Sequence, residues 1–278
     1  MHKPVSLIIS FYNKIDFLRL IFAALEQQSY RDFEVIIADD GSRQDIVHEV
    51  KRLIVESTFQ VKHVWHEDKG WRKNIILNKA IVASEADYLV FIDGDCIPHP
   101  LFLEEHFDSR KPNQVVCGRR VTLTEKTSKY VTSLQIQNRN LHKILFWPLL
   151  FESFFSGEKT HIVHIFRIKN IILRSLLARE KIKGILGCNF SAWKEDLMKV
   201  NGFDERFVHP GMGEDTDLDN RLRHNGVLTI SKKFSITIYH MFHPQLDLSN
   251  RHNFVLRDEN IENKVSFTPY GIDKTNMN

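Results

Sequence analysis

The sequence has little cysteine, no long apolar run and no large excess of charge of either sign. Its three cysteines, Cys96, Cys117 and Cys188, lie far apart without a C-x-x-C pair. We therefore expect neither a disulfide scaffold nor a thiolate zinc site, and this usage fits a reducing, cytoplasmic compartment. No stretch reaches the roughly 18 apolar residues of a spanning helix, and the run Val5–Ile9 is too short for the core of a signal peptide.

The charge balance excludes a further class of partner. There are 38 Lys and Arg residues against 35 Asp and Glu residues, a net charge of +3. This excess is too small to indicate nucleic-acid binding. Hydrophobic residues make up 42% and charged residues 26% of the 278 positions, which is typical of a folded globular protein with a substantial core and excludes a disordered chain.

Strand-like apolar runs alternate with segments of helical spacing in the first 115 residues. The predicted strands are Val5–Ile9, Glu34–Ala38, Val61–Trp65 and Tyr88–Ile92, and the predicted helices are Ile15–Leu25, Asp45–Val55 and Ile75–Ile81. Such alternation predicts an α/β fold with a mostly parallel central sheet and helices on both faces. In open sheets of this kind, ligands bind beyond the carboxyl ends of the strands.

The alternation is less regular after residue 115. Strands are predicted over Val115–Val121, Gly184–Ala192, Val227–Ile230 and Ser235–His240, with a helix over Asp215–His224. Residues 138–183 form a basic, aromatic-rich insert of helical character, in which nine Lys and Arg residues against three acidic residues give a charge of +6. Residues 250–278 are polar, and we expect them to be a peripheral C-terminal tail.

Carboxylates follow two of the predicted buried strands. The pair Asp39 and Asp40 ends one strand, and Asp93-Gly94-Asp95 ends another, so the two groups should share one edge of the sheet. Two carboxylates at this edge suit Mg²⁺ or Mn²⁺ bridging a diphosphate. An Asp-Gly pair is also an ordinary turn, and the pattern alone does not separate these interpretations.

Several motifs, taken in order, resemble a known enzyme family. Val5–Lys14, Ala38–Ser42, Phe91–Asp95 and Gly211–Asp217 resemble the family 2 inverting glycosyltransferases of the GT-A fold. Gly187–Trp193, Val200–Asp204 and Tyr239–Pro244 resemble their galactosyl- and N-acetylgalactosaminyl-transferring branch. The resemblance implies a Rossmann-like GT-A domain over 1–249, with a nucleotide-binding half (1–115), an acceptor-binding half (116–249) and the helical insert at about 138–183.

The resemblance also implies an activity. A hexose or N-acetylhexosamine would be transferred with inversion from a UDP-sugar, with UDP-galactose or UDP-N-acetylgalactosamine favoured. The acceptor would be a hydroxyl of a glycan or a lipid-linked molecule, in surface polysaccharide or glycan biosynthesis.

Donor-site and metal-site residues follow from matching positions in the family pattern. The implied donor ligands are Ser10, Tyr12 and Asp40 around uridine, with Asp40 facing the uracil, Arg72 and Asn78 near the donor, and Asp93 at the ribose. Asp95 would hold Mn²⁺ or Mg²⁺, with His240, or alternatively His243, completing the shell. The chain departs from the family at Ser10 and Phe11, where Pro and Thr are usual.

An inverting transferase needs a base to take the proton of the acceptor hydroxyl. Asp215 lies at the start of a predicted helix, after the glycine-rich Gly211–Gly213. Asp215 and Asp217 could equally cap that helix and interact with its dipole. The resemblance favours Asp215 as the base and Glu214 as a ligand of the acceptor hydroxyl. It also implies that Trp193 stacks under an acceptor sugar, for which core packing is the alternative.

The basic insert allows two interpretations. Its apolar residues Ile162, Ile165, Phe166, Ile172 and Leu176 can share a helix face opposite His164, Arg167 and Arg174. Such a helix can lie peripherally on an anionic membrane surface, here the inner face of the membrane, where a lipid-linked acceptor would be found. Alternatively, the segment packs on the domain or forms a dimer contact.

Other classes of protein fit less well. A phosphoryl-receiver domain would have its aspartate pair after the first strand, whereas this pair follows the second. A sugar nucleotidyltransferase would share the fold but needs a glycine-rich loop with Arg and Lys, which is missing after Ser10. A non-catalytic glycan-binding relative would keep Trp193 and lose Glu214 and Asp215, and both acids are present.

Overall fold

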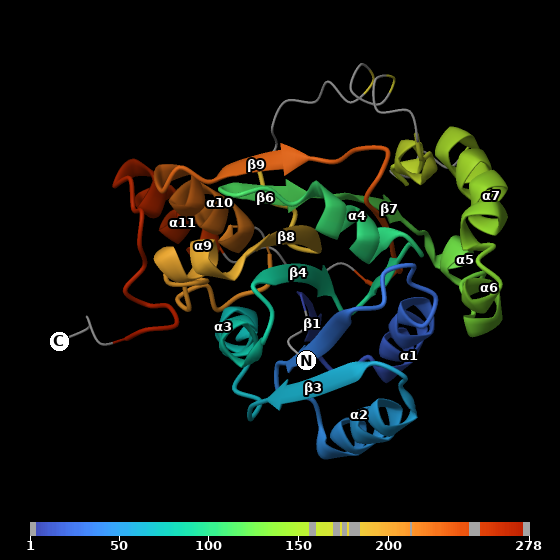
Figure 1. The fold of residues 1–278 in the computed structure, drawn as a ribbon, viewed down its shortest axis with the longest axis horizontal. Helices are drawn as coiled ribbons and strands as arrows, with labels where there is room; N and C mark the ends of the chain where they lie inside the picture. The colour runs from blue at the N-terminus through green and yellow to red at the C-terminus, as the bar shows by residue number, and fades with distance from the viewer. Residues whose placement is uncertain are drawn as a thin grey trace.

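The computed structural model describes residues 4–155, 160–168, 173, 177, 184–211, 213–244 and 251–274. Two sheets organise the chain (Figure 1). The larger has the strand order β3-β2-β1-β4-β8-β6-β9. Its strands are β1 (Val5–Phe11), β2 (Phe33–Asp39), β3 (Gln60–Trp65), β4 (Tyr88–Asp93), β6 (Gln114–Cys117), β8 (Asn189–Trp193) and β9 (Leu228–Ser231). The smaller sheet has the order β5-β10-β7, from β5 (Cys96–Pro98), β10 (Thr237–His240) and β7 (Arg119–Thr122).

The large sheet is mostly parallel, as predicted. β1 pairs in parallel with β2 and β4, β2 with β3, and β6 with β9. β8 is the exception, because it runs antiparallel to both β4 and β6. The predicted α/β fold class, with a central mostly parallel sheet, is therefore confirmed.

Helices cover both faces of this sheet. They are α1 (Ile15–Leu25), α2 (Gln44–Glu56), α3 (Lys73–Ala83), α4 (Phe102–Ser109), α9 (Lys194–Lys199) and α10 (Glu214–His224). Successive strand residues alternate between the faces: Leu7 and Ile9 pack in the core cluster that includes α1 and α2, and Ile8 packs with α3 and α10. Because both faces are buried, the strands are continuous apolar runs.

The predicted strand Val115–Val121 is in fact two strands. It breaks at Gly118 into β6 and β7, which belong to different sheets. A Cβ at Gly118 would lie 2.4 Å from the side-chain amide of Asn189, so the chain turns where only glycine fits. The predicted strand Gly184–Ala192 is likewise shorter, because β8 begins only at Asn189.

A series of helices follows β7. It comprises α5 (Glu125–Ser128), α6 (Ser133–Gln137), α7 (Leu141–Phe155) and the 3-10 turn η1 (Ile162–Ile165). The single amphipathic helix expected over 162–176 is not what the described part shows, since η1 ends at Ile165 and the chain to Ile168 is not helical. His164, expected on the polar face, is buried. Ile172, Arg174 and Leu176 lie outside the described residues.

The polar C-terminal residues pack on the domain, which corrects the expectation of a peripheral tail. Helix α11 (His252–Glu262) contacts α10, and the Asn260 side chain donates a 2.7 Å hydrogen bond to Asp217 Oδ1. The Asn201 side chain donates to the carbonyls of Thr268 and Asp273. Buried amides satisfied in this way let a polar segment dock without an apolar stripe.

None of the helices in the described ranges combines the length and the apolar character needed to span a bilayer.

Candidate active site

The predicted carboxylate edge is formed where β1, β2 and β4 end. Ser10 lies opposite Asp93 on one side and Ala38 on the other. Ser10 Oγ donates a 2.8 Å hydrogen bond to Asp93 Oδ1. A Cβ at Gly94 would lie 2.7 Å from the Ser10 carbonyl oxygen, so the middle position of the D-x-D turn has room only for glycine. The turn is thus held tightly against the end of β1.

Beyond β2, polar groups gather around Asp40. Its Oδ2 accepts a 2.9 Å hydrogen bond from the backbone amide of Arg72, and His66 Nε2 lies 2.7 Å from its Oδ1. Burial raises the pKa of Asp40, although the Arg72 amide and His66 oppose this shift. The half-exposed Tyr12 donates its hydroxyl to Asp68 Oδ2 at 2.9 Å. Polar contacts thus place Arg72 and His66 around Asp40, and the sequence reasoning missed His66.

Asn78 makes its hydrogen bonds elsewhere, to the 203–205 loop. Its Oδ1 accepts from the Phe203 amide at 2.8 Å, and its Nδ2 donates to the Phe203 carbonyl and to Glu205 Oε1. With these bonds the buried amide group is fully engaged in fixing the 203–205 loop. The expected donor contact of Asn78 is therefore corrected to a structural role.

A candidate metal site lies where the two sheets meet. Strand β10 pairs with β5 so that His240 lies opposite Cys96, and the Met241 amide donates to the Asp95 carbonyl at 2.9 Å. His240 Nε2 lies 3.5 Å from Asp95 Oδ1, and His243 Nε2 lies 3.3 Å from Asp95 Oδ2. One ligand atom from each of these three residues falls within a 4.8 Å cluster. The structure thus brings both histidines to Asp95, where the sequence analysis offered them as alternatives.

The metal-ligating atoms of Asp95, His240 and His243 limit which metal ion would fit. One carboxylate and two imidazoles suit a borderline transition metal better than Mg²⁺, which prefers an all-oxygen shell. The three residues are partly buried, so water and a ligand can complete the shell. Asp95, His240 and His243 therefore offer a mixed oxygen and nitrogen donor set that could hold a divalent metal ion.

Glu214 and Asp215 begin α10, next to the D-x-D turn. The residue before the helix is Gly213, at φ 140°, and no side chain caps the helix. Asp215 Oδ2 instead accepts a 2.9 Å hydrogen bond from the Gly187 amide. A Cβ at Gly187 would lie 2.3 Å from Asp215 Oδ1, so glycine is needed there. This disfavours the capping interpretation of Asp215.

Asp217 has a different role from Asp215. It is buried and forms a 2.8 Å ion pair with Arg221, one helical turn away. It also accepts the hydrogen bond from Asn260 described above. Asp217 therefore ties α10 to its surroundings and does not face the site.

The acid pair is strongly perturbed by its environment. Burial, and the charge of Asp215 beside it, raise the pKa of Glu214 to about 8. Burial also raises the pKa of Asp215, against the opposing charge of Lys73. In the described structure, Glu214 Oε2 is buried without a hydrogen-bond partner, which is costly unless a ligand group binds it. Perturbed acids in a pocket are typical of a catalytic site.

Two cations at this site were missed by the sequence reasoning. Lys73 Nζ lies 2.8 Å from Asp93 Oδ1, and its side chain lines the same pocket as Glu214 and Asp215. Burial opposes its charge, but Asp93, Glu214 and Asp215 raise the pKa of Lys73 well above its ordinary value. Arg120 on β7 places its guanidinium 3.9 Å from Cys188 Sγ. One sequence signal could have found Lys73. It directly follows Arg72, which the sequence analysis had placed near the donor, and it begins α3.

Trp193 is not brought to the site. It ends β8 and lies opposite Tyr88, at the start of β4, whereas Asp93 is at the other end of that strand. Its indole nitrogen donates to the Lys111 carbonyl at 2.9 Å, and its ring packs edge-on against Tyr88. The expectation that Trp193 stacks under an acceptor sugar is therefore corrected to the packing alternative.

Comparison with sequence families gives two matches. The model described as Glycosyl transferase family 2 matches residues 6–179, more than half of the chain. A model described as the N-terminal domain of galactosyltransferase matches residues 170–245. Together they cover all the site residues discussed above.

Two curated proteins are similar over most of this chain. Chondroitin synthase of Escherichia coli is 26% identical over 232 residues, covering 80% of this chain and 32% of that protein. Chondroitin synthase of Pasteurella multocida (strain Pm70) is 28% identical over 240 residues, covering 79% of this chain and 23% of that protein. The chain thus spans about a third or less of the length of these relatives.

Among solved structures, the mannosyltransferase PcManGT of Pyrobaculum calidifontis, in complex with GDP-Man and Mn²⁺, superposes with a TM-score of 0.57 at 15% identity. The match covers 88% of this chain and 59% of that one. At this identity the likeness shows the fold, which is that of the GT-A glycosyltransferases.

Proposed function

The chain belongs to glycosyl transferase family 2, and on that premise we propose that it transfers a hexose or N-acetylhexosamine from a UDP-sugar, with inversion, to a hydroxyl of a glycan or lipid-linked acceptor in polysaccharide biosynthesis. The observation that carries the proposal is one pocket lined by Ser10, Lys73, Asp93, Glu214 and Asp215. It joins the D-x-D turn to an acid pair of raised pKa. Binding alone would not need that pair, which favours an enzyme over a non-catalytic glycan-binding relative.

The donor half of the site is assigned to residues of the first 115 positions. Asp40, with its carboxylate fixed by the Arg72 amide and His66, would accept from the imide of uracil, and the ring of Tyr12 would cover the base. Asp93, held by Ser10, would accept from a ribose hydroxyl. The acceptor half lies in 116–249, which contributes Glu214 and Asp215.

Asp215 is proposed as the base. Its Oδ2 is held by the Gly187 amide, which leaves Oδ1 to take the proton of the attacking acceptor hydroxyl. Glu214 lies beside it, and its unpartnered Oε2 would bind a second acceptor hydroxyl. Attack on the face of the sugar opposite the diphosphate inverts the anomeric centre.

Asp95, His240 and His243 would hold the divalent ion, proposed to be Mn²⁺. When bound there, the ion would neutralise negative charge on the diphosphate. Among the described residues, Arg120 and Lys73 bring positive charge near Asp93.

UDP-galactose and UDP-N-acetylgalactosamine are the proposed donors. The match of residues 170–245 to a galactosyltransferase domain and the similarity to chondroitin synthases support this choice. The test is UDP release from a panel of UDP-sugars with Mn²⁺, with GDP-mannose as the competing donor class. Preference for a galactose-configured UDP-sugar is expected. Strict preference for GDP-mannose would overturn the assignment of Asp40 to uracil, and no nucleotide release with any donor and acceptor would favour the glycan-binding alternative.

A further inference from the structure

Two histidine–aspartate pairs lie next to each other near the carboxyl ends of β2 and β3. His63 Nε2 lies 2.9 Å from Asp39 Oδ2, and His66 Nε2 lies 2.7 Å from Asp40 Oδ1. The first pair is closed, because the Asp39 side chain is 0% exposed and its other oxygen accepts from the Ser42 amide. The side chains of the second pair are 11% and 12% exposed. Of these two aspartates, Asp40 is therefore the one that a ligand can reach.

The directions of the hydrogen bonds at His66 follow from its partners. An ionised carboxylate only accepts, so the His66 nitrogen that faces Asp40, Nε2, carries the hydrogen. Lys79 on α3 only donates, and its Nζ lies 3.4 Å from the other ring nitrogen, Nδ1. A chain of donors thus runs from Lys79 through His66 to Asp40.

The carboxylate of Asp40 is held at both oxygens. Oδ1 faces His66, and Oδ2 accepts a 2.9 Å hydrogen bond from the Arg72 amide. Each carboxylate oxygen has two lone pairs, so one donor at each oxygen leaves acceptor capacity for a ligand. Because the two contacts fix the plane of the carboxylate, that capacity has a set direction.

The segment that supplies both donors is itself fixed against the end of β2. A Cβ at Gly41 would lie 2.5 Å from Asp68 Cα, so the two backbones touch where only glycine fits. The Tyr12 hydroxyl donates to Asp68 Oδ2 at 2.9 Å. His66 and Arg72 lie two and four residues from Asp68 in the chain, and they are therefore kept in place before any ligand binds.

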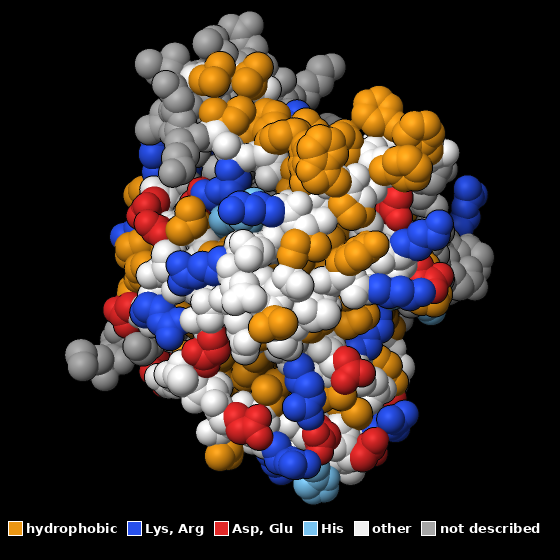
Figure 2. Space-filling view, turned by 90° about the vertical axis from the view of Figure 1, so that its right-hand side faces the viewer, with side chains coloured by type: hydrophobic (Ala, Val, Ile, Leu, Met, Phe, Trp, Pro, Cys, Tyr) orange, Lys and Arg blue, Asp and Glu red, His pale blue; other side chains and the backbone are white. Residues whose placement is uncertain are grey.

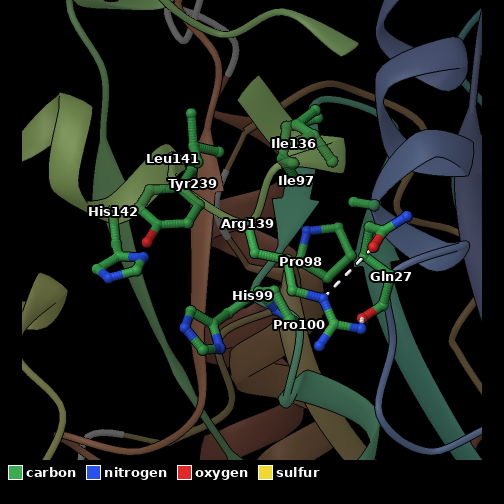
Figure 3. Close-up of a pocket in the computed structure, with 11 residues that line it drawn as sticks. Gln27, Ile97, Pro98, His99, Pro100, Ile136, Arg139, Leu141, His142 and Tyr239 are labelled. Atoms are coloured by element: carbon green, nitrogen blue, oxygen red, sulfur yellow. Dashed lines mark hydrogen bonds between the residues drawn. The ribbon is translucent and has the colours of Figure 1, made fainter. Parts of the chain in front are cut away.

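Two other features of the described residues suit the recognition of a base edge less well. The pocket of Figure 3, beside Ile97 and Arg139, has a volume of about 20 Å³, which is room for about one water molecule. Figure 2 views the side on which α7 lies, and hydrophobic side chains gather at the top of that view. Aromatic rings stack on any base, so they do not separate one base from another.

Uracil and cytosine differ at the ring atom that a carboxylate would contact. N3 of uracil carries a hydrogen, whereas N3 of cytosine is a bare acceptor. A fixed carboxylate accepts from uracil, but it faces the cytosine N3 lone pair with no hydrogen between the two atoms. Such an unpaired polar contact is costly. A carboxylate that was free to turn away would avoid this cost, so the discrimination depends on what holds Asp40.

We propose that His66 is a specificity-determining residue, which aligns Asp40 so that the site prefers uracil nucleotides to cytosine nucleotides. This role rests on the proposed function, in which Asp40 accepts from the uracil of a UDP-sugar, and it names the residue that makes that contact selective. His66 acts through Asp40 and is therefore a positioning residue.

The test is calorimetric titration of the full chain with UDP and with CDP, both in the presence of Mn²⁺. We expect the wild type to bind UDP about 10²-fold or more tightly than CDP. His66→Phe and His66→Leu each remove the donor to Asp40, and either should lower this ratio of affinities by about tenfold or more, because a hydrogen bond to a charged group is lost. His66→Gln has an amide that can donate to Asp40 and should keep most of the ratio.

His63→Phe is the matched control, because it removes the equivalent contact of Asp39. It should lower Tm and leave the ratio of UDP to CDP affinity unchanged, as a purely structural role of His66 would also do. The proposal is overturned if the wild type prefers UDP and the His66 variants keep that preference, or if His63→Phe lowers the ratio as much as they do. Equal affinity of the wild type for UDP and CDP would overturn the assignment of Asp40 to uracil as well.

Discussion

Lys73 and Asp93 form an ion pair of 2.8 Å at the floor of the active-site pocket, and Ser10 donates to the same carboxylate oxygen of Asp93. Burial opposes the charge of Asp93, but Lys73 and Ser10 lower its pKa. Lys73 also offsets the charges of Glu214 and Asp215 in the same pocket. One lysine thus links the donor side of the site to the proposed base.

Replacing Lys73 tests this link. In Lys73→Met a positive charge next to Asp215 is lost, so the pKa of the base rises and the acid limb of the pH profile of kcat moves to higher pH. We expect kcat measured at a fixed pH on the acid limb to fall by about tenfold for each pKa unit by which that limb moves. Lys73→Arg keeps the charge and should restore much of the rate. An unshifted acid limb in Lys73→Met would contradict the assignment.

Asp215→Asn removes the proposed base. We expect kcat for transfer to fall by about 10²- to 10⁴-fold, with the KM for the donor changed only a few-fold. The matched variant is Asp217→Asn in the same turn of α10. Because Asp217 forms a buried pair with Arg221, this control should lose about 3 kcal/mol of stability and lower Tm while the folded enzyme keeps its kcat. Wild-type transfer by Asp215→Asn would refute the base.

Glu214 makes a pH-dependent contribution to stability. Burial raises its pKa from 4.5 to about 8, so between these values the folded state holds a proton that the unfolded state has released. The wild type should therefore lose stability as pH rises from about 4.5 to 8. Glu214→Gln removes this penalty.

The gain from Glu214→Gln should be small near pH 4.5, grow through that window and level off above pH 8 at on the order of a few kcal/mol. Urea denaturation without ligands at several pH values measures it. Glu56→Gln, at an exposed position of α2, is the control and should show no such trend. A constant difference between Glu214→Gln and wild type would contradict the raised pKa.

Both histidines near Asp95 should contribute to Mn²⁺ binding. His240→Ala and His243→Ala are each expected to weaken Mn²⁺ affinity by about tenfold or more, because each removes one imidazole ligand. Calorimetric titration with Mn²⁺ measures this directly, and His48→Ala on α2 is the control. EDTA should abolish transfer by the wild type. If only one of the two variants loses affinity, the other histidine is not a ligand.

Trp193 should affect stability and not acceptor binding. Trp193→Ala loses the contact with Tyr88 and the hydrogen bond to Lys111, at a cost of about 2 kcal/mol. The KM for the acceptor should stay within twofold of wild type when measured below the lowered Tm. A large increase in that KM would return Trp193 to the acceptor site.

Local sequence patterns predicted the elements of the first 115 residues and the position of the ligand edge. Apolar periodicity is local, so β1 to β4 and α1 to α3 were predicted within a few residues of their observed bounds. Parallel strands end at one edge, which places Ser10, Asp40 and Asp93 together. The acid pair was likewise found from its motif at the start of a helix.

The contacts of each side chain depend on tertiary packing, because the contacting residues lie far apart in the chain. The direction of β8 could not be read from its apolar pattern, and its antiparallel course carries Trp193 to the edge opposite Asp93. Asn78 is bound by the 203–205 loop, and Lys73 by an aspartate 20 residues away. These pairings depend on how the elements pack, and the periodicity that sets the elements carries no information about them.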